Sequence, residues 1–340
     1  MQLRHEHDER ACKYMIRMGL LGASRVSRYA VIEPAAIIEG LGVSAVAARD
    51  AVRAASFAET NGIPRVQADY NALLASDTVD LVYIGLPPSG HARWTIAALE
   101  AGKHVLCEKP FAMNAAEAQA MVDTAKRTGK ILIEAWHYRF HPLFARVLEV
   151  LDSGAIGAVQ GIRAHFNVRI LPEPGEIRYD PTLGGGAMMD LGCYCVHWAR
   201  SVMGEEPAVL SAAAIRHETG VDARMDAMLV FPGGVRAEVS AAMSGRPAEG
   251  LDAELEITGE RGKLTVVNPV SPHTGHELII EAPDGRSREE VAGETTFAHQ
   301  LRHVIGVLNG NAVPLTGGSD AIANMRVLDA IYRAAGMRPD

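Results

Sequence analysis

The 340-residue chain is long enough for two domains, and its 48% hydrophobic and 22% charged residues are typical of a globular protein. Its formal net charge of -8, without a basic cluster, argues against nucleic acid or an anionic membrane as a partner. The apolar runs fall short of the roughly 18 residues that suggest a membrane span. The four cysteines include no C-x-x-C pair, so we predict no metal and expect a reducing, cytoplasmic setting.

The first part of the chain alternates between predicted strands and helices. Residues 1–13 are mostly charged and polar, and we expect a disordered extension there. Helical patterns separate the apolar strand patterns, which lie at 14–21, 43–48, 79–85, 105–107 and 130–135. This alternation predicts an α/β domain over 14–136, with a parallel sheet that is covered by helices.

The pattern changes after residue 136. One amphipathic helix is predicted over 141–153, and short runs that alternate apolar and polar residues then dominate. The predicted strands are 160–168, 209–217, 225–231, 235–243, 252–258, 263–267 and 278–282, and two late helices are 295–309 and 319–336. We therefore expect an α+β domain over 137–340 with a large open, mainly antiparallel sheet.

A glycine turn follows the first predicted strand. Gly22-Ala23-Ser24-Arg25 stands between strand and helix, which is the place of the G-x-G-x-x-G dinucleotide fingerprint. Of the three glycines of this motif, the sequence has only the first, Gly22, and serines occupy the other two positions, Ser24 and Ser27. Both serines are small, so the backbone could still approach a pyrophosphate. A plain tight turn before a helix is the alternative.

Two arginines lie near the end of the second predicted strand. Arg49 is at the strand tip, and Arg53 is one helical turn further on. Two guanidinium groups side by side suit the 2′-phosphate of NADP, because arginine binds phosphate bidentately. Asp50 could instead bind the ribose of NAD, which keeps NAD possible. The alternative for Arg53 is a solvated helix face.

The short strand 105–107 ends abruptly in Glu108-Lys109-Pro110. Proline cannot continue the hydrogen-bond ladder of a sheet, so the strand must stop there. Lys109 would then stand at the carboxyl end of a strand, where open α/β sheets bind their ligands. An ordinary solvated surface lysine is the alternative.

A glycine-rich stretch in the second half, 184–198, carries three polar side chains at helical spacing. If this stretch is a helix, Asp190, Tyr194 and His197 share one face. An acid, a phenol and an imidazole together form a plausible acid–base cluster. The alternative is a capping aspartate with a buried tyrosine and a buried histidine.

Two histidine pairs have the i,i+4 spacing of metal ligands, His137 with His141 and His299 with His303. Neither pair contains the glutamate of the H-E-x-x-H motif. We therefore interpret all four as structural or surface histidines.

These stretches together resemble the GFO/IDH/MocA family of NAD(P)-dependent oxidoreductases, from about residue 15 to about residue 336. The resemblance rests on the glycine turn, on the E-K-P tripeptide, and on the runs 134–142 and 184–194. Within the family the chain is most similar to the branch of dihydrodiol dehydrogenase and NADP-dependent D-xylose dehydrogenase. The runs that point to this branch are 46–50, 193–196 and 216–222.

The resemblance implies that the first domain is a Rossmann domain that binds NADP, with NAD possible. The cofactor residues that it implies are Gly22, Ala23, Ser24, Arg25, Arg49, Arg53, Leu86, Pro87, His91, Glu108, Lys109, Pro110, Trp136 and Arg139. The substrate residues that it implies are Lys109, Asp190, Tyr194 and His197, of which His197 stands where relatives often have aspartate. The sheet of the second domain would form the interface of a homodimer or homotetramer.

The expected reaction is hydride transfer between nicotinamide and a carbonyl or hydroxyl carbon of a sugar, polyol or diol. Lys109 ranks first and Tyr194 second as the proton carrier, and Asp190 orients the substrate hydroxyls or the tyrosine–lysine pair. Beside a cationic nicotinamide, partial burial should lower the pKa of Lys109. Two other functions stay open, a glycoside-cleaving enzyme with transient oxidation by NAD and a catalytically silent cofactor-binding sensor.

Overall fold

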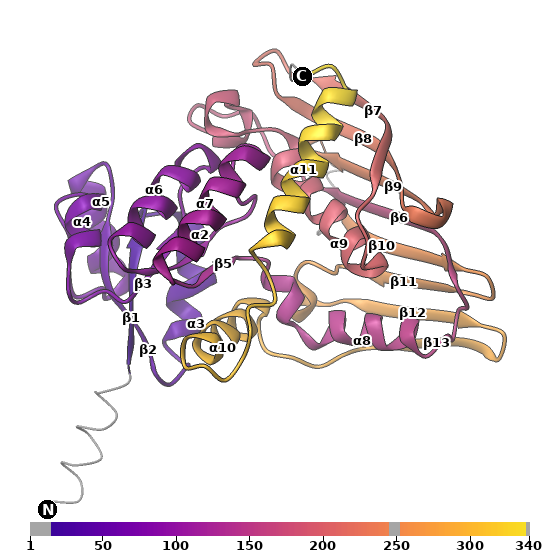
Figure 1. Ribbon diagram of the computed structural model, residues 1–340, viewed down its shortest axis with the longest axis horizontal. Coiled ribbons are helices and arrows are strands. Elements are labelled where there is room, and N and C mark those ends of the chain that lie inside the picture. Colours follow the sequence, from indigo (N-terminus) through magenta and orange to yellow (C-terminus); the bar gives the residue numbers. More distant parts are fainter. Residues whose placement is uncertain (1–14, 245–251, 338–340) are drawn as a thin grey trace, which may run out of the picture.

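The computed structural model describes residues 15–244 and 252–337, and the extension predicted over 1–13 lies outside them. Two sheets stand side by side in this structure, a smaller one from the first part of the chain and a larger one from the second part (Figure 1). Both carry helices. The predicted fold class, a Rossmann domain with an α+β domain, is confirmed.

The smaller sheet is parallel throughout and has the strand order β2-β1-β3-β4-β5. Its strands are β1 (Ile16–Leu21), β2 (Leu41–Ala47), β3 (Leu81–Ile84), β4 (His104–Cys107) and β5 (Leu132–Glu134). The intervening helices are α2 (Arg25–Ser27), η1 (Arg28–Ile32), α3 (Glu33–Ala35), α4 (Ala51–Asn61), α5 (Tyr70–Ala75), α6 (Pro88–Glu100) and α7 (Ala115–Thr128). Helices cover the sheet, so β3 is buried along its whole length.

Helix boundaries in this half follow from capping residues. Asp50 and Asn114 precede α4 and α7, and each side chain accepts a hydrogen bond from a backbone N–H in the first helical turn. Gly62 and Gly129 end the same helices in the left-handed conformation that favours glycine. Helix α6 begins at Pro88, because proline fits the first helical position.

The larger sheet has the order β13-β12-β11-β10-β6-β9-β8-β7 and is antiparallel except between β6 and β9. Its strands are β6 (Val159–Asn167), β7 (Ala208–Arg216), β8 (Asp222–Val230), β9 (Arg236–Ala242), β10 (Asp252–Gly259), β11 (Lys263–Val267), β12 (Glu277–Ala282) and β13 (Gly285–Glu289). The prediction omitted β13, whose residues are mostly exposed and lack an apolar alternation.

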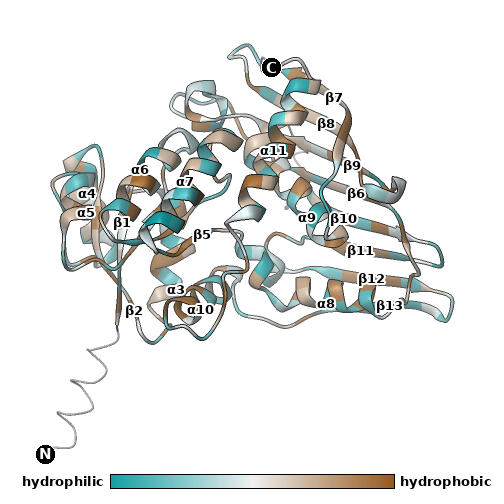
Figure 2. Cartoon of the chain, viewed as in Figure 1, coloured by the Kyte–Doolittle hydropathy of each residue, from teal (hydrophilic) through white to brown (hydrophobic). Residues whose placement is uncertain are grey.

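One face of the larger sheet packs on helices, and the other face is open. Ile162, Ala164 and Phe166 of β6 are buried, while Arg163 and His165 alternate with them on the outer face. The same alternation of hydrophobic and hydrophilic residues runs along its neighbours (Figure 2). The helices of this half are η2 (His137–Phe140), α8 (Pro142–Asp152), η3 (Ile177–Tyr179), η4 (Pro181–Leu183), η5 (Met188–Gly192), α9 (Cys193–Met203), η6 (Pro232–Gly234) and η7 (Pro272–Thr274).

The two last helices, α10 (Thr296–Leu308) and α11 (Ser319–Ala334), join the halves of the molecule (Figure 1). Leu301 and Val304 of α10 share one buried cluster with Met18 of β1, so α10 packs on the smaller sheet. Asp329 of α11 accepts a hydrogen bond of 2.8 Å from the backbone N–H of Ala115, at the start of α7. Residues after 290 thus pack on both halves.

Candidate active site

The glycine turn lies where the strand order of the smaller sheet reverses. The chain moves outward from β1 to β2 on one side and to β3 on the other, and such switch points are where open α/β sheets bind ligands. Gly22 has a φ of +100°, and a Cβ there would lie 3.0 Å from the carbonyl oxygen of Gly85 at the end of β3. The Ser24 hydroxyl accepts a hydrogen bond from the Ser27 backbone N–H and caps α2. This bare, tightly folded turn before a helix fits a dinucleotide pyrophosphate.

Arg49 and Arg53 both belong to the segment that faces this turn. Arg49 is exposed after β2, and Arg53 donates a hydrogen bond of 2.9 Å from Nη2 to the carbonyl oxygen of Ala23. The Arg53 guanidinium therefore lies against the glycine turn rather than on a remote helix face. Asp50 Oδ1 accepts from the Arg53 backbone N–H at 3.0 Å, so this carboxylate caps α4.

The chain after β4 places an acid and an amine at the carboxyl edge of the same sheet. Glu108 is buried, and its Oε1 accepts a hydrogen bond of 2.8 Å from the hydroxyl of Tyr83 on β3. Burial raises the pKa of Glu108, while the Lys109 charge and the Tyr83 hydrogen bond oppose that rise. The Lys109–Pro110 peptide bond is cis. Glu108 is thus held inside, and the side chain of Lys109 reaches toward the second half of the molecule.

Lys109 meets Asp190 there. The ammonium donates to the Asp190 carbonyl oxygen at 2.8 Å and to its carboxylate Oδ1 at 2.9 Å. Burial alone would lower the pKa of Lys109, but the charge and hydrogen bond of Asp190, together with Cys193 and Glu108, outweigh burial and raise the pKa of Lys109. The lowered pKa that the sequence analysis expects beside a cationic nicotinamide stays a prediction, and the ion pair with Asp190 opposes it.

Asp190 is also held by an arginine that the sequence reading did not single out. Arg178 Nε donates to Asp190 Oδ2 at 2.6 Å, and Arg178 Nη1 donates to Glu176 Oε1 at 3.0 Å. Burial opposes the charge on Asp190, but Lys109 and Arg178 outweigh it and lower the pKa of the Asp190 carboxyl. Two cations and two carboxylates thus form one chain of charges.

Glycines bring the arginine loop close to Asp190. The Gly186 backbone N–H donates to the carbonyl oxygen of Arg178 at 2.9 Å, and a Cβ at Gly185 would collide with the same oxygen. A Cβ at Gly186, whose φ is +124°, would collide with the Asp222 carboxylate. The glycine-rich stretch therefore serves close backbone packing before the π-helical turn η5, which carries Asp190.

Tyr194 lies directly beside Lys109. The ammonium nitrogen is 5.0 Å from the centroid of the Tyr194 ring, which is a cation–π contact. The Tyr194 hydroxyl is hydrogen-bonded at 2.9 Å to Nε2 of His137. Burial raises the pKa of Tyr194 well above its ordinary value. The structure thus brings Lys109, Asp190 and Tyr194 together, although Lys109 and Asp190 come from different halves of the chain.

Three side chains that the sequence analysis predicts at cofactor or substrate are buried. His197 stacks on Trp136 with ring centroids 4.4 Å apart, and its two nitrogens bond Tyr138 and Asp320. Trp136 itself is fully buried. His91 is fully buried and bonds two carbonyl oxygens, those of Leu86 and Pro110. The contacts of these three side chains that the structure shows are with other protein groups, and their direct contact with cofactor or substrate stays a prediction.

The remaining predicted cofactor residues differ in their accessibility. Arg25 is exposed at the start of α2, and Leu86 and Pro87 are half-buried before α6. The Arg139 guanidinium lies 4.7 Å from the centroid of the Phe144 ring. A direct role of these side chains at a cofactor stays a prediction.

Within residues 15–244 and 252–337, no three His, Cys, Asp or Glu side chains are grouped as ligands for a metal ion. Over the same ranges, none of the helices combines the length and the apolar character needed to cross a membrane.

Both halves of the chain match known protein families. Residues 16–135 match the oxidoreductase family with an NAD-binding Rossmann fold, and residues 144–265 match the GFO/IDH/MocA C-terminal domain. The chain belongs to the GFO/IDH/MocA family of oxidoreductases. It is 35% identical to D-xylose 1-dehydrogenase (NADP(+)) 2 of Haloferax volcanii, over 93% of this chain and 96% of that protein. It is 34% identical to trans-1,2-dihydrobenzene-1,2-diol dehydrogenase of Xenopus tropicalis, over 77% and 79%.

Solved structures of this family superpose over almost the whole chain. Aldose–aldose oxidoreductase from Caulobacter crescentus, complexed with glycerol, has a TM-score of 0.86 at 27% identity and covers 95% of this chain and 98% of its own. A 3-ketoreductase from Actinomadura kijaniata in complex with NADP and TDP-benzene has a TM-score of 0.84 at 27% identity and covers 94% and 98%. The GFO/IDH/MocA chain described here is an NAD(P)-dependent oxidoreductase that acts on CH–OH groups.

Proposed function

We propose that this GFO/IDH/MocA oxidoreductase uses NADP and interconverts a hydroxyl and a carbonyl group of a sugar, polyol or diol, with Lys109 and Tyr194 handling the proton. The observation that carries the proposal is the contact of Lys109 with both Asp190 and Tyr194. The relatives named for D-xylose and dihydrodiol substrates support the substrate class. When bound, the nicotinamide supplies or accepts the hydride.

Lys109 is suited to hold the substrate oxygen. An ammonium has three N–H donors, and two of them are used on Asp190. Among the described residues the third makes no hydrogen bond, so it can donate to a carbonyl or hydroxyl oxygen. Because Asp190 keeps the amine charged, this donor polarises a carbonyl strongly. Lys109 is therefore the first candidate for proton carrier and Tyr194 the second. Asp190 holds Lys109, and Arg178 holds Asp190 from the other side.

The turn beside β1 supports NADP as the preferred cofactor. The Arg53 guanidinium already lies against the glycine turn, and Arg49 is exposed next to it. Asp50 is engaged as the cap of α4, which makes it less available for a ribose hydroxyl. Two guanidinium groups without a competing carboxylate favour the 2′-phosphate of NADP over the ribose of NAD.

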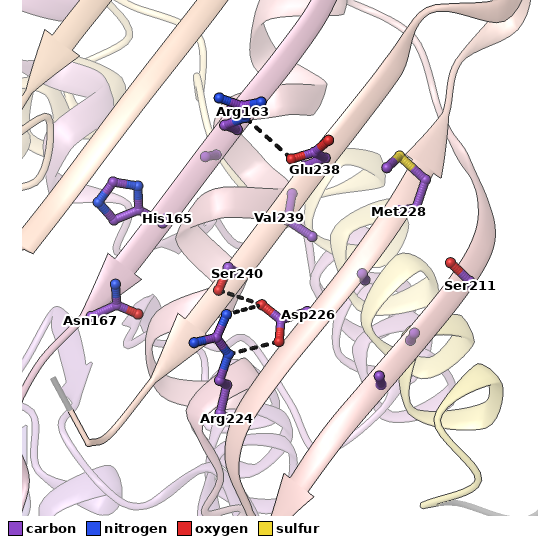
Figure 3. A pocket seen from close by; sticks show the side chains of 14 residues that line it. Arg163, His165, Asn167, Ser211, Arg224, Asp226, Met228, Glu238, Val239 and Ser240 are labelled. Carbon is purple, nitrogen blue, oxygen red and sulfur yellow. Dashed lines mark hydrogen bonds and ion pairs between the residues drawn. The ribbon is translucent and has the colours of Figure 1, made fainter.

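The outer face of the larger sheet supports a homodimer or homotetramer. Residues of β6, β7, β8 and β9 enclose a hollow of about 610 Å³ on this face (Figure 3). Arg163 pairs with Glu238, and Arg224 pairs with Asp226, so charges of both signs lie across the strands. A second copy that presents the same balanced face could meet it in an isologous contact.

A substrate panel tests the proposed function. Aldoses, ketosugars, inositols and diols are offered with NADP⁺ and with NADPH, and the nicotinamide absorbance is followed. We expect net absorbance change with at least one neutral polyhydroxylated compound, and slower turnover with NAD(H). Full retention of cofactor with no net absorbance change while a glycoside is cleaved would contradict it, as would no turnover with any class.

A further inference from the structure

His137 is the neighbour that holds the Tyr194 hydroxyl. It lies in η2, directly after β5 and Trp136, and is buried. Its Nε2 is 2.9 Å from Tyr194 Oη, and its Nδ1 is 2.8 Å from the hydroxyl oxygen of Thr296 at the start of α10. Its ring stacks on Phe297 with centroids 4.1 Å apart. The imidazole is therefore fixed on both nitrogens and on one face.

This imidazole carries one proton at neutral pH. Burial, together with the charge of Lys109, lowers the pKa of His137 to about 3. The proton is then on Nε2 or on Nδ1, and each choice sets the direction of both hydrogen bonds.

Thr296 decides between the two choices. It is fully buried, and among the described residues its hydroxyl bonds only His137 Nδ1. If Nδ1 carried the proton, it would donate to Thr296 Oγ1 and leave the threonine hydrogen without an acceptor. A buried hydrogen-bonding group without a partner destabilises the folded protein, because its desolvation is not compensated. If Nδ1 accepts from Thr296 instead, the proton lies on Nε2 and is donated to Tyr194. The hydrogen left over is then that of the phenol, and Tyr194 is 4% exposed beside Lys109, whereas Thr296 is 0% exposed.

We propose that His137 is a positioning residue for Tyr194: its Nε2–H donates to the phenol oxygen, and Thr296 fixes this tautomer. The phenol hydrogen is then not used on His137 and stays available for a substrate oxygen beside Lys109. This inference rests on the proposed function for its catalytic meaning, but the hydrogen-bond directions do not.

The arrangement also stabilises Tyr194 after it has donated. In the direction of reduction, the substrate carbon gains the hydride and its oxygen gains a proton, so C=O becomes CH–OH. When Tyr194 gives that proton, its oxygen becomes a phenolate that accepts from His137 Nε2–H and lies near the Lys109 charge. When Lys109 gives it, Tyr194 donates a hydrogen bond and the same Nε2–H strengthens that donor.

The first test measures the tautomer without any substrate. Histidine labelled with ¹⁵N gives separate signals for a protonated and an unprotonated ring nitrogen, and the His137 signals are assigned by their loss in His137→Gln. We expect a protonated Nε2 and an unprotonated Nδ1 from pH 6 to 8, and a change at Nδ1 in Thr296→Val. A protonated Nδ1, or a doubly protonated ring, overturns the proposal.

The second test is kinetic and uses a substrate from the panel above. His137→Phe keeps the stacking surface and should lower kcat about tenfold, with the affinity for NADPH unchanged. His137→Gln should recover most of the loss, because its amide can donate at a similar reach. His141→Asn, which alters a neighbouring buried histidine that bonds Leu143 and not Tyr194, is the control and should keep its kcat.

A double variant separates positioning from a merely structural role. In a Tyr194→Phe background, His137→Phe should cause no further loss, because the hydroxyl that it serves is absent. An equal further loss in that background, or no recovery in His137→Gln, overturns the proposal. If no panel compound is turned over, the proposed function fails, and the ¹⁵N signals still decide the hydrogen-bond directions.

Discussion

Lys109 and Asp190 stand 81 residues apart in the sequence, and their side chains form an ion pair of 2.9 Å with only 15% and 19% of each exposed. The lysine follows a strand of the smaller sheet, and the aspartate lies in the helical turn that packs on the larger one. A buried pair of this kind loses much of its stabilisation to desolvation. We infer that its main effect is on the position and charge of the amine.

Replacing Lys109 with methionine tests the amine itself. Lys109→Met keeps a similar chain length but removes the donor for the substrate oxygen, so kcat should fall about 10²- to 10³-fold. Binding of NADPH, titrated by fluorescence, should stay within a few-fold. Lys103→Met is the matched control. Lys103 directly precedes β4, and its Nζ donates to the carbonyl oxygen of Ser76, away from Asp190. Unchanged turnover in Lys109→Met would refute the assignment.

Replacing Asp190 with asparagine tests the charge that holds the amine. Asp190 raises the pKa of Lys109, so Asp190→Asn should lower that pKa. The reductive rate needs the charged amine and is lost as pH rises through its pKa. The alkaline limb of the kcat profile should therefore move to lower pH. Asp80→Asn, which removes a carboxylate paired with Arg17, should leave that limb in place.

The sequence was sufficient for the architecture because the signals there are local. Apolar runs with a glycine or proline near their ends indicated most strands of both sheets within a few residues. The end of the strand at Glu108-Lys109-Pro110 could be predicted because its signal, a proline directly after an apolar run, is also local. Strand β13 was missed because its exposed residues carry no apolar period.

Much of the candidate site could not be predicted, because it depends on contacts between distant segments. Arg178 lies in an irregular loop, and only the fold shows that it bonds Asp190. His197 and Tyr194 are close in one helix, yet one is enclosed by Trp136 and the other meets Lys109. Spacing along a helix indicates which side chains share a face, but not which neighbour covers that face.

The two arginines near the glycine turn predict a cofactor preference. The double variant Arg49→Ala/Arg53→Ala should weaken the binding of NADPH by at least tenfold and change the binding of NADH little. The reason is that each guanidinium bonded to the 2′-phosphate contributes about 1.5–3 kcal/mol to binding. Fluorescence titration with both cofactors measures this. Arg65→Ala, another exposed arginine of the same half, serves as the control. Equal affinities for NADPH and NADH in the unaltered protein would contradict the preference.

If chains assemble through the outer face of the larger sheet, charges added to that face should dissociate the homo-oligomer. Ser211 and Ala213 of β7 line the hollow on that face, and Figure 3 shows Ser211 at its border. Ser211→Arg with Ala213→Arg adds two charges there, so the mass in sedimentation velocity should fall to that of one chain. Val313→Arg adds a charge at a residue that is 81% exposed between α10 and α11 and should keep the assembly. A single-chain mass for the unaltered protein would end this proposal.

A buried histidine near α8 predicts a loss of stability in acid. Burial and the neighbouring His299 and His276 lower the pKa of His141 to about 4, against about 6.5 in an unfolded chain. Between these values the unfolded chain binds more protons, so the free energy of unfolding falls as pH falls from about 6.5 toward 4.

The His141 contribution should amount to about 1–2 kcal/mol between pH 7.5 and 5, which is less than the full shift because neighbouring histidines titrate with it. Urea unfolding at the two pH values measures it. His141→Asn keeps a side chain that can cap α8, as His141 Nδ1 does by accepting from the Leu143 N–H at 3.1 Å. This variant should lose less stability on acidification than the unaltered protein. An identical loss in both would show that His141 does not cause the acid sensitivity.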